Sequence, residues 1–116
     1  MSTITIYGIK NCNTMKKTFT WLDDNGVDYT FHDYKKQAPD ADVLKRAFAI
    51  HGWESVINRK GMTWRKLPDD VKANMDENGA MEIALEKSSI IKRPLMVRGD
   101  DITLGFSEDT YSEIFN

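Results

Sequence analysis

The sequence contains a single cysteine, Cys12, in 116 residues. One cysteine excludes a disulfide within the chain, and it excludes a zinc site built from several thiolates. Any redox reaction of Cys12 therefore needs a thiol from another molecule. There are only two histidines, His32 and His51, and they lie far apart in the sequence. This scarcity argues against a His–Cys catalytic pair, and we expect no metal site.

Long apolar runs and an excess of one charge are also missing. No segment approaches the roughly 20 apolar residues that a membrane span needs. The chain opens without the basic segment and apolar stretch of a signal peptide. The net charge is −2, with both signs mixed along the chain, so no basic surface for nucleic acid is expected. We expect a cytoplasmic monomer with neither nucleic-acid nor membrane partners.

The composition that is present suits one soluble globular domain. The sequence is 41% hydrophobic and 29% charged, as in ordinary globular proteins, and its length suits a single domain over residues 1–116. An alternating pattern predicts a strand over residues 3–7. Apolar residues at helical spacing predict a helix over 14–25, and an aromatic-rich stretch predicts a second strand over 28–34. Strand, helix and strand form a βαβ unit with parallel neighbours.

The second half of the chain predicts helices followed by a hairpin. Helices are expected over residues 39–52, from residue 68 onward and over 80–87, whereas 53–67 reads as irregular. Short strands at 95–98 and 102–104 form a hairpin, and Ser107 caps a last helix. The pattern predicts an α/β, thioredoxin-like fold: βαβ and then ββα on one mixed four-stranded sheet, with a helical insertion at about 38–90.

Cys12 lies between the first strand and the first helix, which is a place that favours a thiolate. The unpaired N–H groups of a helix N-terminus carry partial positive charge, and they lower a cysteine pKa from ~8.5 toward ~3.5–7.5. Lys10, Lys16 and Lys17 act in the same direction. The thiolate is the nucleophile, so the position predicts a reactive residue. A buried, inert cysteine is the alternative, and the local sequence leaves both open.

The segment Ile91-Lys92-Arg93-Pro94 precedes the third predicted strand. An X-Pro bond adopts the cis form at low cost, and Arg93 is placed to direct a guanidinium at an anion near Cys12. On local sequence alone, a plain loop with a solvated basic pair is the favoured interpretation.

Several motifs together resemble one family. Tyr7-Gly8-Ile9-Lys10-Asn11-Cys12, Asn58-Arg59-Lys60-Gly61 and Ile91-Lys92-Arg93-Pro94-Leu95 follow one another along the chain. The series resembles the ArsC/Spx family of arsenate reductases and their relatives over essentially the whole chain. The stretches Thr63-Trp64-Arg65-Lys66-Leu67 and Leu104-Gly105-Phe106-Ser107 look closest to the YffB-type branch of that family.

The resemblance implies a thioredoxin fold, a nucleophilic cysteine at Cys12 and anion-binding arginines at Arg59 and Arg93. It also implies that Pro94 is a cis proline facing the cysteine. Glutathione is the implied co-substrate, with a binding site formed by Lys10, Asn11, Arg59, Arg93 and Pro94. Within that site, Lys10, Arg59 and Arg93 would hold the carboxylates of glutathione or stabilise the thiolate. The implied activity is a glutathione-dependent thiol–disulfide reductase, with a glutaredoxin or a disulfide-bearing protein as a further partner.

Four departures from the family pattern bear on the alternatives. Arsenate reductases of this type have a third arginine where this chain has Phe106, and a histidine where it has Gly8. They have a Ser-Arg pair where it has Met15 and Lys16. An arsenate oxyanion needs several fixed donors, so arsenate reduction is the weaker expectation. Spx-type regulators often carry a second cysteine at the position of Met15. A module that binds RNA polymerase, as those regulators do, is the other alternative.

Overall fold

The computed structural model describes residues 4–115. These residues form two compact units. The first unit contains the described residues up to Asp33 and from Arg93 onward, and the second contains Tyr34–Lys92. Each unit is described by itself below. That the chain forms a single domain stays a prediction.

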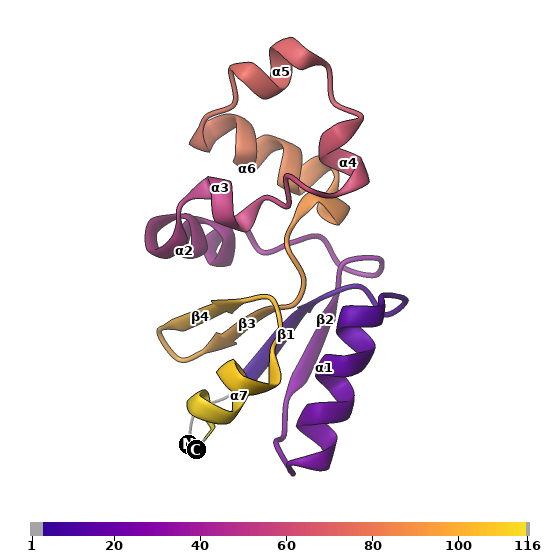
Figure 1. The fold of residues 1–116 in the computed structure, drawn as a ribbon. Helices are drawn as coiled ribbons and strands as arrows, with labels where there is room; N and C mark the ends of the chain where they lie inside the picture. The colour runs from indigo at the N-terminus through magenta and orange to yellow at the C-terminus, as the bar shows by residue number, and fades with distance from the viewer. Residues whose placement is uncertain (1–3, 116) are drawn as a thin grey trace. The chain divides into compact units, whose positions relative to one another are not determined.

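The first unit contains one four-stranded sheet and two helices (Figure 1). The elements are β1 (Ile4–Gly8), α1 (Asn13–Asp24), β2 (Thr30–Asp33), β3 (Leu95–Arg98), β4 (Asp101–Leu104) and α7 (Glu108–Ile114). The strand order is β2-β1-β3-β4. The β1 and β2 strands are parallel, whereas β3 is antiparallel to both of its neighbours. The predicted mixed sheet is therefore confirmed. Its first strand extends through Gly8, and its second is shorter than predicted.

One face of this sheet carries the core of the first unit. Ile4 and Ile6 alternate along β1, so both point to the same face. They cluster with Met96 of β3, with Met15 and Leu22 of α1, and with Tyr111 of α7. Both helices therefore cover the same face of the sheet. Their packing on this face fixes where the first turn of α1 lies.

The second unit is helical. Its elements are α2 (Ala41–His51), α3 (Trp53–Val56), α4 (Met62–Arg65), α5 (Asp69–Ala73), α6 (Glu77–Glu86) and the 3-10 helix η1 (Ser88–Ile90). Two expectations were wrong. Residues 53–67 contain the short helices α3 and α4, and α6 begins three residues before the predicted start at residue 80.

Side-chain caps explain where two of these helices, α2 and α6, begin. The Asp40 carboxylate accepts the N–H groups of Asp42 and Val43 at 2.9 and 3.3 Å. The Asp76 carboxylate accepts the Gly79 N–H at 2.8 Å, so α6 begins before Gly79 and includes it.

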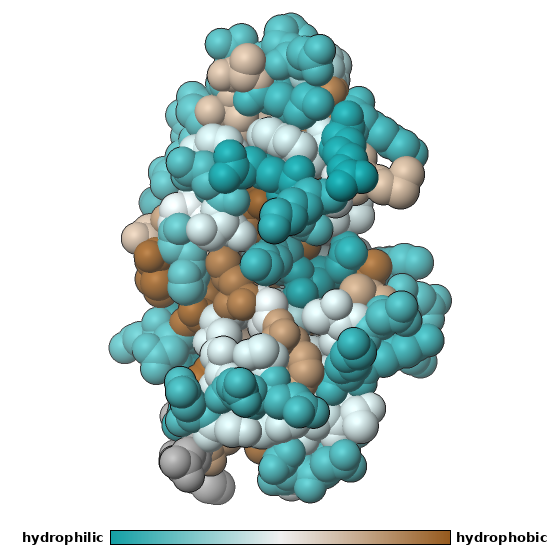
Figure 2. Space-filling view, in the orientation of Figure 1, coloured by the Kyte–Doolittle hydropathy of each residue, from teal (hydrophilic) through white to brown (hydrophobic). Residues whose placement is uncertain are grey.

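The second unit has its own small core. It is formed by Val43, Leu44, Ala47, Phe48, Val56, Ile57, Ala80, Ala84, Ile90 and Ile91, which are all buried. An isolated antiparallel bridge joins Ile57 to Ile91. Hydrophilic residues cover most of the visible surface of this unit (Figure 2). Within residues 4–115, no helix has both the length and the apolar character needed to cross a membrane.

Candidate active site

Cys12 lies at the first turn of α1, directly after the loop that leaves β1. Its backbone is extended, with φ −144° and ψ 131°, and it is the N-cap residue of the helix. Its carbonyl accepts the Lys16 N–H at 2.9 Å, which is the first bond of the helix. The side chain is partly exposed, and Cys12 packs against the core of the first unit. Cys12 thus lies partly exposed at the N-terminus of a helix, the position that the sequence predicted.

Opposing influences act on the thiol, and the net effect favours the thiolate. Partial burial raises the pKa of Cys12. Hydrogen bonding by the backbone N–H groups of Met15 and Thr14 lowers it, as do the positive charge and hydrogen bond of the Arg93 guanidinium. The pKa of Cys12 therefore lies below its ordinary value. A lowered pKa increases the thiolate fraction near neutral pH.

Arg93 reaches Cys12 because of the sheet register. Leu95, two residues after Arg93, is paired with Tyr7 at the end of β1 from which the cysteine loop leaves. The Arg93–Pro94 bond is cis, as the resemblance implied. Pro94 is buried, and its carbonyl accepts the Gly105 N–H at 2.9 Å. The end of β4 is therefore fixed beside the proline, next to the arginine that contacts the thiol.

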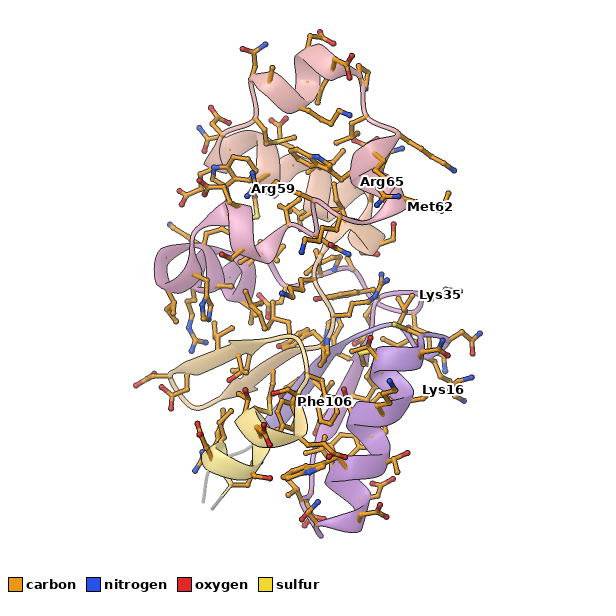
Figure 3. All side chains as sticks on the ribbon, in the orientation of Figure 1. Lys16, Lys35, Arg59, Met62, Arg65 and Phe106 are labelled. Atoms are coloured by element: carbon orange, nitrogen blue, oxygen red, sulfur yellow. The ribbon has the colours of Figure 1, made fainter. Side chains whose placement is uncertain are left out.

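The other predicted site residues are divided between the units. Lys10 and Asn11 are exposed in the loop just before Cys12. Arg59 belongs to the second unit, where Figure 3 shows it near α3. Its guanidinium carbon lies 5.9 Å from the centre of the Trp53 ring, in a cation–π contact. An approach of Arg59 to the thiol stays a prediction, as does glutathione binding by all of these residues.

Met15 occupies the place of a second cysteine and packs tightly. It is fully buried. A Cβ atom added to Gly8 would lie 2.7 Å from the Met15 Sδ and 2.8 Å from its Cε. The thioether thus fills the space that a side chain at position 8 would need. The same residue supplies one of the N–H groups that favour the Cys12 thiolate.

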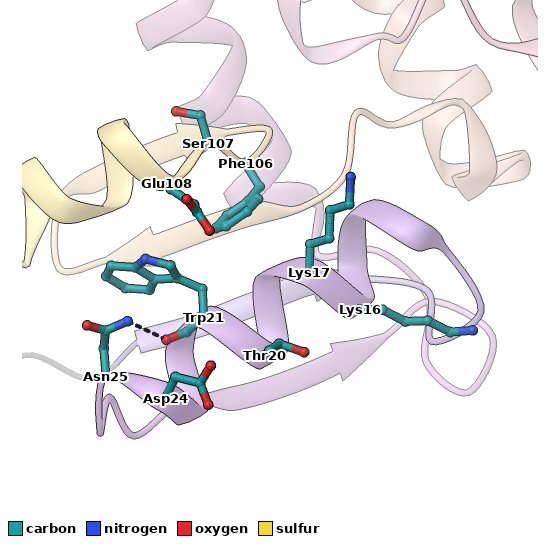
Figure 4. A pocket seen from close by; sticks show the side chains of 9 residues that line it. All are labelled: Lys16, Lys17, Thr20, Trp21, Asp24, Asn25, Phe106, Ser107 and Glu108. Atoms are coloured by element: carbon teal, nitrogen blue, oxygen red, sulfur yellow. Dashed lines mark hydrogen bonds between the residues drawn. The ribbon is translucent and has the colours of Figure 1, made fainter.

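Phe106 stands where the family pattern has a third arginine. Its ring packs edge-on against Tyr111, with centroids 4.8 Å apart. It also lines an open groove of about 620 Å³ between α1 and the start of α7 (Figure 4). Trp21 lines the same groove and packs edge-on against Tyr111 at 5.6 Å. The sequence analysis did not identify this groove.

No group of three or more His, Cys, Asp and Glu side chains close enough to hold a metal ion occurs in the part of the chain that the structure describes.

Comparison with known proteins shows the family and the fold. The model of the ArsC family matches residues 7–114. The solved structure of the YffB (PA3664) protein is 48% identical, with a TM-score of 0.92 over 96% of this chain and 97% of that one. An arsenate reductase (ArsC) related protein from Brucella melitensis is also 48% identical, with a TM-score of 0.78 over 98% and 95% of the two chains.

A more distant relative is a regulator. The global transcriptional regulator Spx of Streptococcus pyogenes is 24% identical over 91% of this chain and 80% of its own length. The structural matches confirm the predicted thioredoxin-like fold. The predicted resemblance, including that to the YffB-type branch, is confirmed as well.

Proposed function

The chain belongs to the ArsC family, and on that basis we propose that it is a thiol–disulfide oxidoreductase that uses Cys12 and glutathione. The observation that carries the proposal is the surroundings of the thiol. Cys12 is partly exposed at a helix N-terminus, and the Arg93 guanidinium favours its thiolate. An accessible thiolate is the group that attacks disulfides.

The proposed cycle has two exchange steps. The Cys12 thiolate attacks one sulfur of a disulfide, the old S–S bond breaks, and the other half leaves as a thiolate. A glutathione thiolate then attacks the mixed disulfide and releases Cys12. An external thiol is required because Met15 is a thioether and the sequence has no second cysteine. Reduced glutathione supplies that thiol, and we propose the cytoplasm as the location.

Arsenate reduction is less well supported in this chain. A phenyl ring packed on Tyr111 replaces the third arginine of the family pattern. A phenyl ring donates no hydrogen bond to an oxyanion. In the described first unit, Arg93 is therefore not joined by a guanidinium at position 106. The relative called a global transcriptional regulator is 24% identical to this chain. No contact among the described residues favours a regulatory role for this protein.

The test is to incubate the reduced protein with oxidised glutathione from pH 5 to 10 and to follow its intact mass. We expect one glutathione adduct, an apparent pKa below ~8.5, and release of the adduct by reduced glutathione. Cys12→Ser is the control and should form none.

Turnover is then measured with reduced glutathione, bis(2-hydroxyethyl) disulfide and a coupled glutathione reductase. A wild-type adduct rate that rises only near pH 8.5, or the absence of turnover, would contradict the proposal. The same turnover assay with arsenate in place of the disulfide tests the arsenate reductase alternative.

A further inference from the structure

The groove between α1 and the segment 106–108 is a feature of the first unit that the proposed chemistry leaves without a role. Its volume is about 620 Å³, within the ~300–1,000 Å³ range of ligand sites. Six of its lining residues carry the argument: Lys16, Lys17, Trp21, Asp24, Phe106 and Glu108. Figure 4 shows α1 forming one wall and the start of α7 the other.

The groove begins one helical turn after the reactive cysteine. Lys16 is one helical turn from Cys12, and its N–H bonds the Cys12 carbonyl at 2.9 Å. On the opposite wall, Phe106 directly follows Gly105, which is hydrogen-bonded to Pro94. The distance along α1 from Lys16 to Asp24 is about 12 Å at ~1.5 Å per residue. An extended peptide covers that length with three to four residues at ~3.3 Å each.

The chemistry of the lining changes along this length. Two lysines, Lys16 and Lys17, lie at the cysteine end, and both are exposed. Two carboxylates, Asp24 and Glu108, are also exposed and lie toward the Trp21 end of the groove (Figure 4). The groove therefore has a positive end near the thiol and a negative end away from it.

The middle of the groove is aromatic and well supported. Trp21 and Phe106 are partly buried, and both rings pack edge-on against the fully buried Tyr111. Rings held in this way present a fixed apolar surface at little entropic cost. An aliphatic side chain would fit that surface better than a further charge.

We propose that this groove binds the polypeptide that flanks the substrate disulfide, with an acidic residue next to the reacting cysteine, then an apolar residue, then a basic one. The inference rests on the proposed function and names its substrate class, a peptide or protein disulfide. In the mixed disulfide, Cys12 is bonded to the peptide cysteine while the flank lies along α1. The other half of the disulfide leaves as a thiolate and takes a proton from water.

The test uses two capped peptides of identical composition, Cys-Glu-Leu-Lys and Cys-Lys-Leu-Glu, each as its symmetric disulfide and each also made in the reversed chain direction. The rate of adduct formation on Cys12 is followed by intact mass. Exposed ion pairs contribute modestly, and the two peptides differ in the pairs that they form at both ends of the groove. We therefore expect the peptides with the acidic residue beside cysteine to react about three- to tenfold faster in one chain direction.

Charge reversal at the far end of the groove provides the variant. Glu108→Lys should weaken this preference, and Asp24→Lys added to it should bring the preference to about one, because both ends of the groove are then positive. Glu113→Lys is the matched control, because Glu113 is also an exposed glutamate of α7 and does not line the groove. The control should keep the wild-type preference.

The outcomes separate the two proposals. Bis(2-hydroxyethyl) disulfide has no peptide flank and reports on Cys12 alone. If it reacts normally but the peptide preference is absent, or is the same in Glu108→Lys and Glu113→Lys, the groove proposal is wrong and the proposed function stands. If no disulfide modifies Cys12 below the pH range of an ordinary thiol, both proposals are overturned.

Discussion

Substitution of Gly8 by alanine tests the packing that holds the first turn of α1 against β1. The added Cβ would lie 2.7 Å from the Met15 Sδ and 2.8 Å from its Cε, distances well inside normal contact. Met15 is fully buried, so any shift of its Sδ and Cε must be accommodated inside the core. Overpacking of this kind costs about 1–3 kcal/mol. The lower backbone entropy of unfolded alanine offsets about 0.4–1 kcal/mol.

The expected net loss for Gly8→Ala is about 1–2 kcal/mol of unfolding free energy, which lowers Tm by roughly 4–8 °C for a protein of this size. Urea unfolding followed by circular dichroism measures it. Met15→Ala removes the colliding atoms and itself costs about 2–5 kcal/mol. In the double variant the alanine at position 8 should no longer be penalised, which gives a coupling energy of about 1–2 kcal/mol.

A second measurement connects this packing to the thiol. The Met15 N–H is one of the groups that lower the pKa of Cys12. A displaced first turn weakens that interaction, so Gly8→Ala should also raise the pKa of Cys12. A neutral Gly8→Ala, or single penalties that add within ~0.5 kcal/mol in the double variant, would refute the reasoning.

Three further predictions follow from the described contacts. Arg93→Met removes a hydrogen bond and a positive charge from the thiolate, so it should raise the pKa of Cys12 and slow adduct formation at pH 7. Arg93→Lys keeps the charge and should retain part of the wild-type effect. An unchanged pH profile of adduct formation in Arg93→Met would contradict the contact. Because folding lowers the pKa of Cys12, the stability advantage of wild type over Cys12→Ser should be fully present above ~8.5 and disappear as the pH falls through the folded pKa; denaturant titrations across pH that show the opposite slope would exclude this. Within residues 4–115 the buried Tyr111 hydroxyl has no hydrogen-bond partner, and an unsatisfied buried group costs about 1–3 kcal/mol. Tyr111→Phe should therefore be at least as stable as wild type in urea unfolding. A clear loss of stability in this variant would contradict the absence of a partner.

The sheet and its helices could be predicted because their apolar residues recur at the spacing of a strand or a helix and face the core. Ile4 and Ile6 alternate onto the core side of β1, and Met15 and Leu22 lie at helical spacing on α1. Such patterns report directly on burial. Residues 53–67 were read as irregular because helices of a single turn are too short to show a period. The early start of α6 depends on one side-chain cap at Asp76, which overrides the glycine that follows.

The site could be predicted only in part. Cys12 was recognisable because it follows a strand and opens a helix. Arg93 lies far along the chain from it, and local sequence favoured a solvated loop; only the family resemblance placed Arg93 at the thiol. The groove at Trp21 and Phe106 had no signal in the sequence, because it depends on how α7 packs beside α1.

The buried Met15 also has a practical consequence. A dithiol enzyme releases its covalent intermediate within the same molecule, and investigators must mutate the second cysteine to capture the bound partner. With a thioether at that position and no other cysteine in the sequence, the proposed intermediate would persist until an outside thiol arrives. Its lifetime would be set by the concentration of that thiol. In a thiol-free lysate, the unaltered protein would act as its own covalent trap, and the proteins released from it by a reductant would be its substrates.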